Sequence, residues 1–98
     1  MQVIENWADI HGRIQSLSEP GDFPGFATAL IDVKSVAAVP GFANLFEQAN
    51  GQTVRVNIPE KAVRECSLGP GRLVSCRIRK GGPHSAFAHP QQVSAVKD

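Results

Sequence analysis

The sequence predicts a mainly β fold, a small five-stranded barrel within one domain that spans residues 1–98. Two stretches, residues 53–58 and 72–80, alternate apolar and polar side chains. That period of two belongs to strands with one buried and one exposed face. Between them lies a short helical pattern at residues 60–68. A chain of 98 residues with 42% apolar content has enough material for one core.

The two alternating strands and the helix between them have clear boundaries. Asn50-Gly51 precedes the first strand and is a strong hairpin-turn signal. Pro59 ends that strand and suits the start of a helix, and Gly69-Pro70-Gly71 stops the helix. The predicted inward residues are Val54, Val56, Ile58, Val74, Cys76 and Ile78.

Residues 1–18 are predicted to form an N-terminal helix. Apolar residues recur there at intervals of four, three, four and three, which places them on one helical face: Val3, Trp7, Ile10, Ile14 and Leu17. The alternative is a strand over residues 8–17 with Ile10, Gly12 and Ile14 inward. The strand explains fewer of the apolar positions, so we favour the helix.

The rest of the chain supplies three further strands. Residues 25–39 are predicted as a long strand, whose alternation changes phase after Ser35 and so indicates a bulge or bend. Residues 43–48 are predicted as a short strand and residues 87–96 as the last one, with Pro90 placing its first half at an edge or a bulge. Residues 18–24 and 81–85 are predicted as loops.

This element order over residues 25–96 resembles the OB-fold superfamily, a five-stranded Greek-key barrel with a helix between the third and fourth strands. An SH3-like or other small barrel would give a similar pattern. The resemblance implies binding of single-stranded nucleic acid or oligosaccharide by the second and third strands and by the loops joining strands one–two and four–five. By predicted order, those loops are residues 39–43 and 81–86.

Charge and aromatic residues favour non-catalytic binding of single-stranded DNA or RNA. Residues 1–50 hold six acids and two bases, whereas residues 51–98 hold eight bases and three acids. Cationic side chains bind the phosphates of a single strand, and exposed aromatic rings stack on its bases. Phe26, Phe46 and Phe87 suit either the core or stacking. The candidate binding residues are Phe42, Arg55, Asn57, Arg77, Arg79, Lys80 and His84.

The alternative function is a protein-interaction module or small subunit. Its interface, to a partner or a second copy, would be the apolar stripe of Val3, Trp7, Ile10, Ile14 and Leu17. We expect neither an enzyme nor a cofactor, because the sequence holds none of the common catalytic or nucleotide-binding motifs.

We expect no metal site, because Cys66 and Cys76 lack the spacing of a zinc-binding pair. The N-terminal sequence lacks the apolar core of a signal peptide. No apolar run approaches the ~20 residues that span a bilayer. We therefore expect a cytoplasmic protein without a membrane partner.

Overall fold

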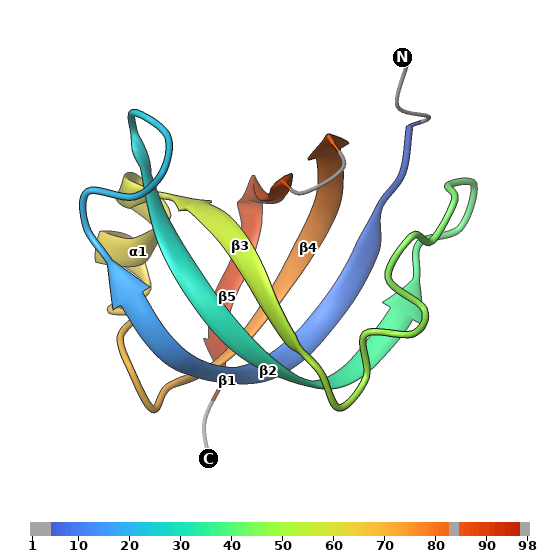
Figure 1. Ribbon diagram of the computed structural model, residues 1–98, viewed down its shortest axis with the longest axis horizontal. Coiled ribbons are helices and arrows are strands. Elements are labelled where there is room, and N and C mark those ends of the chain that lie inside the picture. Colours follow the sequence, from blue (N-terminus) through green and yellow to red (C-terminus); the bar gives the residue numbers. More distant parts are fainter. Residues whose placement is uncertain (1–4, 83–84, 97–98) are drawn as a thin grey trace.

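The computed structural model describes residues 5–82 and 85–96, and in this part of the chain five strands close into a ring of mixed β-sheet (Figure 1). The ring order is β1-β2-β3-β5-β4, so the barrel closes where β4 pairs with β1. Along the chain, the elements are β1 (Ala8–Ser18), β2 (Phe26–Ala38), β3 (Thr53–Pro59), α1 (Glu60–Glu65), β4 (Leu73–Gly82) and β5 (Ser85–Val96).

The predicted N-terminal helix is wrong, because residues 8–18 form the strand β1. The inward residues are Ala8, Ile10, Gly12 and Ile14, all buried. After Ile14 the register shifts, so that Leu17 lies opposite the inward Ala29. A bulge adds one residue to a strand, so a residue three positions after an inward residue can itself point inward, as Leu17 does after Ile14. The helical spacing therefore came from a bulged strand.

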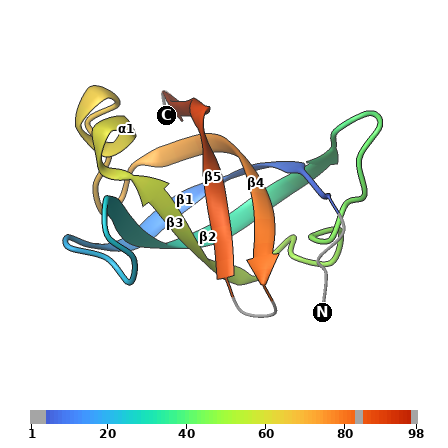
Figure 2. The same ribbon diagram turned by 90° about the horizontal axis from the view of Figure 1, so that it is seen from above.

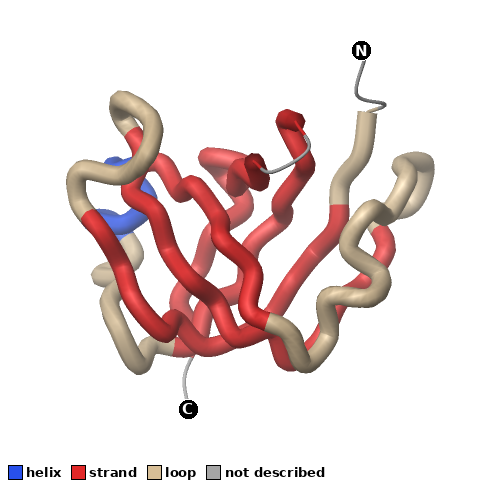
Figure 3. Tube along the Cα trace, in the orientation of Figure 1, coloured by secondary structure: helices blue, strands red, loops and turns tan. Residues whose placement is uncertain are grey.

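The predicted short strand at residues 43–48 is also wrong. Residues 39–52 form the connection between β2 and β3, drawn as loop in Figure 3. Asn44 turns this segment locally, because its side-chain oxygen accepts a hydrogen bond from the Phe46 N–H at 2.9 Å. The predicted first strand, residues 25–39, is therefore the second strand, and the loop between β1 and β2 is residues 19–25.

The predicted bend in the long strand is confirmed as a register shift between β1 and β2. His11 lies opposite Ser35, whereas Gly12 lies opposite Val33, which leaves Lys34 as the extra residue. The strands approach closely here: a Cβ added to Gly12 would lie 2.3 Å from the Asp32 carbonyl oxygen. Glycine is thus required where the bulged strands cross.

The other predicted elements are confirmed as β3, α1, β4 and β5. The barrel interior is filled by β-branched side chains that are at most 1% exposed: Ile10, Ile14, Ile31, Ile58, Ile78, Val56 and Val74. At one end of the barrel, Ala62 and Val63 of α1 join this core, and at the other end Phe46 of the β2–β3 connection does (Figure 2). Within residues 5–82 and 85–96, no helix has the length and apolar character needed to cross a membrane.

The seam between β3 and β5 is parallel, whereas the other strand pairs are antiparallel. Its register pairs Val56 with Ala86 and Asn57 with Phe87. The side chain of Asn57 reinforces it: its amide donates to the Ala86 carbonyl at 3.0 Å, and its oxygen accepts from the Thr28 hydroxyl at 3.0 Å. One buried side chain therefore links β2, β3 and β5.

Candidate binding surface around the β4–β5 hairpin

The β4–β5 hairpin presents a different face to each of two grooves. Arg79 lies opposite Phe87 in the register, and Lys80 lies opposite Ala86. Because neighbouring residues of a strand point to opposite faces, the first pair faces outward and the second faces the end of the barrel. Arg79 and Phe87 line one groove, whereas Lys80 and Ala86 line the other.

The outward groove, which we call the ring groove, has a volume of about 400 Å³. The Trp7 and His89 rings contact each other in a tilted arrangement, with centroids 5.3 Å apart, and the Phe26 and Phe87 centroids are 5.5 Å apart. The Arg79 guanidinium lies 5.8 Å from the Trp7 ring centroid, close enough for a cation–π contact. The lining is Trp7, Phe26, Arg79, Phe87, Ala88, His89 and Pro90.

The position of Phe87 in the ring groove depends on a glycine. A Cβ added to Gly81 would lie 2.8 Å from Cε2 of Phe87, so the ring packs directly on the bare backbone. The backbone N–H of Trp7 donates to the Ala43 carbonyl at 3.1 Å, which fixes the chain just before β1. The rings of the groove are thus held by backbone contacts from separate parts of the chain.

The second groove, the barrel-end groove, has a volume of about 690 Å³ and lies between the β2–β3 connection, the start of β3 and the hairpin. Lys80 and Arg55 bring positive charge to it, and Glu47 brings negative charge. The Lys80 ammonium lies 5.5 Å from the centroid of the buried Phe46 ring. Polar side chains from three segments line this groove, among them Asn44, Gln48 and Thr53, so it suits a hydrated, charged ligand segment.

Two cations predicted to bind nucleic acid lie in ion pairs. Arg55 meets Asp22 through two hydrogen bonds, of 2.8 and 3.0 Å, and both side chains remain exposed, at 57% and 44%. The hydrogen bonds raise the pKa of Arg55 and lower that of Asp22. Arg77 pairs with Asp9 at 2.8 and 3.2 Å, which raises the pKa of Arg77.

The remaining predicted binding residues are dispersed. Asn57 is 3% exposed and bonded within the seam, so its side chain is not on the surface. Phe42 is 40% exposed on the β2–β3 connection and lines neither groove. Arg79 and Lys80 lie on opposite faces of the hairpin. His84 lies outside the described residues.

The described residues of the predicted apolar stripe do not share one exposed surface. Ile10 and Ile14 are each 1% exposed inside the barrel, and Leu17 packs partly against the same core. Trp7 points outward into the ring groove. Val3 lies outside the described residues.

Sequence reasoning missed the ring groove as a unit. Trp7 was assigned to a helical face, and His89 was left out of the binding residues. One signal was present: Phe26 precedes the inward Ala27 and Phe87 lies between the inward Ala86 and Ala88, so both rings are out of phase with the buried residues.

Neither thiol is part of a disulfide. Cys66 is partly exposed and its thiol donates to the Val93 carbonyl at 3.3 Å, whereas burial raises the pKa of Cys76 to about 12. Within residues 5–82 and 85–96, no three His, Cys, Asp or Glu side chains gather as metal ligands would. No protein-family model matches this chain, and no curated protein matches it.

Proposed function

We propose that this protein is an OB-like barrel that binds single-stranded DNA or RNA around the β4–β5 hairpin, without catalysing a reaction. The observation that carries the proposal is the ring groove, where Trp7, Phe26 and Phe87 flank Arg79. Every base has a π-face, and stacking on a protein ring contributes about 1–3 kcal/mol per base regardless of sequence. A groove of this composition therefore suits unpaired bases.

The ring order of the strands supports an OB-like assignment. The helix α1 falls between β3 and β4, as in that superfamily, and β5 lies between β3 and β4 in the sheet. OB-folds use the face of the second and third strands with the loops β1–β2 and β4–β5. Because β1 is Ala8–Ser18, the β1–β2 loop is residues 19–25 and not residues 39–43. Phe23 of this loop contacts Phe87 of the ring groove.

Three cations around the hairpin set the electrostatic part of the binding energy. Arg79 borders the ring groove, while Arg55 and Lys80 border the barrel-end groove. Single strands release about 0.7 counterion per neutralised phosphate. Three contacts therefore predict a slope of about −2 for log affinity against log salt, or roughly a 20-fold loss between 50 and 200 mM.

The test is titration of a labelled thymidine oligonucleotide at those two salt concentrations. Trp7 is the chain's single tryptophan, so its fluorescence reports on the ring groove directly. We expect the oligonucleotide to quench it. We expect Phe87→Leu to weaken binding by about 5- to 140-fold, the loss of one stacked base.

Phe42→Leu provides the comparison, because Phe42 is exposed but lies outside both grooves. It should bind like the wild type. Weaker binding by Phe42→Leu with normal binding by Phe87→Leu would move the site to the β2–β3 connection. The absence of binding at low salt would refute the proposed function, because phosphate attraction is strongest there.

The alternative of a protein-interaction module has no observation in its favour. It depended on an apolar stripe along residues 1–18, and Ile10 and Ile14 of that stripe lie inside the barrel. A partner on that surface would have to open the ring to reach them.

A further inference from the structure

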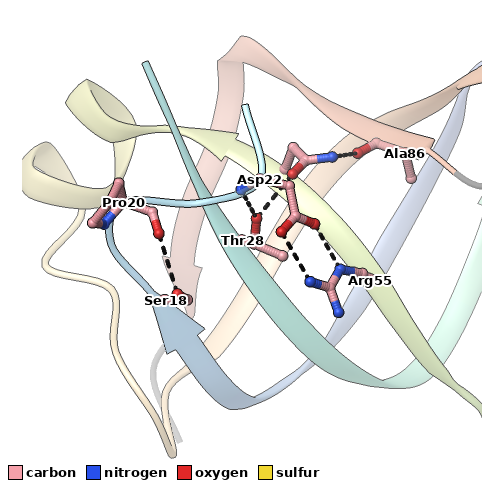
Figure 4. Close-up of polar contacts among 7 residues, drawn as sticks. Ser18, Pro20, Asp22, Thr28, Arg55 and Ala86 are labelled. Atoms are coloured by element: carbon pink, nitrogen blue, oxygen red, sulfur yellow. Dashed lines mark hydrogen bonds and ion pairs between the residues drawn. The ribbon is translucent and has the colours of Figure 1, made fainter. Parts of the chain in front are cut away.

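The loop between β1 and β2, residues 19–25, lies across the outer wall of the barrel, and we call it the strap (Figure 4). Two successive residues of the strap each cover one element of the proposed binding surface. The Asp22 carboxylate holds Arg55, at the edge of the barrel-end groove. The Phe23 ring packs on Phe87, in the ring groove, with centroids 5.2 Å apart.

The backbone of the strap is anchored independently of these two side chains. The Gly21 N–H donates to the Phe26 carbonyl at 2.9 Å, and the Asp22 N–H donates to the Thr28 hydroxyl at 2.8 Å. A Cβ added to Gly21 would lie 2.6 Å from the Phe26 carbonyl oxygen. The strap base therefore stays attached when the Asp22 and Phe23 side chains turn away.

The two side-chain contacts are weak enough for a ligand to displace. Asp22 and Arg55 are both largely exposed, and exposed ion pairs of this kind contribute little because water and salt screen them. Phe23 itself is 39% exposed, so its contact with Phe87 buries the ring only in part. A phosphate offers Arg55 the same two-pronged acceptor as a carboxylate, and a base offers Phe87 another flat ring.

We infer that the strap is an internal competitor for nucleic acid, with the Asp22 carboxylate in the place of a phosphate on Arg55 and the Phe23 ring in the place of a base on Phe87. The inference rests on the proposed function. A ligand must then replace both contacts to occupy the surface. A free phosphate or a neutral aromatic compound replaces only one, so the strap favours ligands that carry a phosphate and a base together.

The experiment measures oligonucleotide affinity at low salt for the wild type, Asp22→Asn, Phe23→Ser and Glu19→Gln. Asp22→Asn removes the competing charge, and we expect about two- to fivefold tighter binding. Phe23→Ser uncovers Phe87, and we expect about two- to tenfold tighter binding. Glu19→Gln is the matched control, because it removes one negative charge from the strap without touching the Arg55 pair. It should change affinity less than Asp22→Asn.

The outcomes separate the inference from the proposed function. If the wild type binds the oligonucleotide but Asp22→Asn binds it no more tightly than Glu19→Gln does, the strap inference is overturned and the proposed function stands. Weaker binding by Phe23→Ser also overturns it, because Phe23 would then be a ligand contact. If neither the wild type nor Asp22→Asn binds, the proposed function fails and the inference fails with it. Circular dichroism on each variant confirms that the barrel is folded.

Discussion

Replacing Asn57 by alanine should destabilise the barrel while leaving the proposed binding surface chemically intact. Asn57 was a predicted binding residue on sequence grounds, but its side chain is buried at the β3–β5 seam. Asn57→Ala removes the acceptor of the Thr28 hydroxyl and the donor to the Ala86 carbonyl, both at 3.0 Å. The variant therefore distinguishes a structural amide from a ligand-binding one.

The size of the effect follows from the two groups left behind. A buried polar group that loses its partner costs about 1–3 kcal/mol. The Thr28 hydroxyl keeps the hydrogen bond that it accepts from the Asp22 N–H, so the cost of leaving it without an acceptor lies near the low end of that range. The sum is about 3 kcal/mol, a large part of the 5–15 kcal/mol that stabilises a typical domain.

Urea denaturation measures this loss. With a slope of about 1–1.5 kcal/mol per molar urea, typical of a small domain, the midpoint should fall by about 2–3 M. Thr53→Ala is the control, because Thr53 is an exposed residue of the same strand whose hydroxyl donates to Asp32 at the surface. It should shift the midpoint by well under 1 M.

Two results would refute the reasoning. One is a midpoint for Asn57→Ala within 0.5 M of the wild type, roughly the scatter of surface substitutions. The other is a normal midpoint combined with a loss of oligonucleotide binding as large as that of Phe87→Leu. The second result would mean that the Asn57 amide lies on the binding surface and that the register of the β3–β5 seam is wrong.

Three further predictions concern packing, thiol reactivity and pH. Gly12→Ala should lower the melting temperature by about 4–20 °C, because its Cβ would lie 2.3 Å from the Asp32 carbonyl oxygen; an unchanged value would contradict the β1–β2 register. In the native protein a thiol reagent should modify Cys66 before Cys76, whose pKa burial raises to about 12; equal rates would show that β4 opens readily. The Asp22 pKa is lowered by Arg55, so the pair stabilises the fold above the ordinary aspartate pKa of about 3.9 and this contribution is lost as pH falls through the lowered value. The stability difference between wild type and Asp22→Asn in urea should therefore be present at pH 7 and fade as the pH falls through the lowered Asp22 pKa; a difference that grows on acidification would contradict the pairing.

The sequence predicted β3 and also the bulged strand β2, but it did not predict β1. Residues 53–58 alternate without a break and match β3 (Thr53–Pro59) closely. In β1 the alternation holds from Ala8 to Ile14, and the register shift after Ile14 then puts Leu17 out of phase with it. Local spacing cannot separate a bulged strand from a helix, because the pairing partner that produces the bulge lies elsewhere in the chain.

That single error moved the predicted binding loop. A helix over residues 1–18 makes the long strand the first strand of the barrel, and the loop after it then stands in the position of the β1–β2 loop. Phe42 was chosen for that reason, and Phe23 of the true loop was overlooked. The sequence could not predict the ring groove for a further reason, because Trp7, Phe26 and Phe87 come together only when the sheet closes into a ring.

The place of β5 in the ring affects how the chain behaves during synthesis. The strand is the last along the chain, yet it lies between β3 and β4 and pairs with both. Until residues 85–96 leave the ribosome, β3 and β4 each keep an unpaired edge, and such edges recruit strands from other chains. We therefore expect the nascent protein to expose an open sheet, prone to aggregation, until β5 inserts.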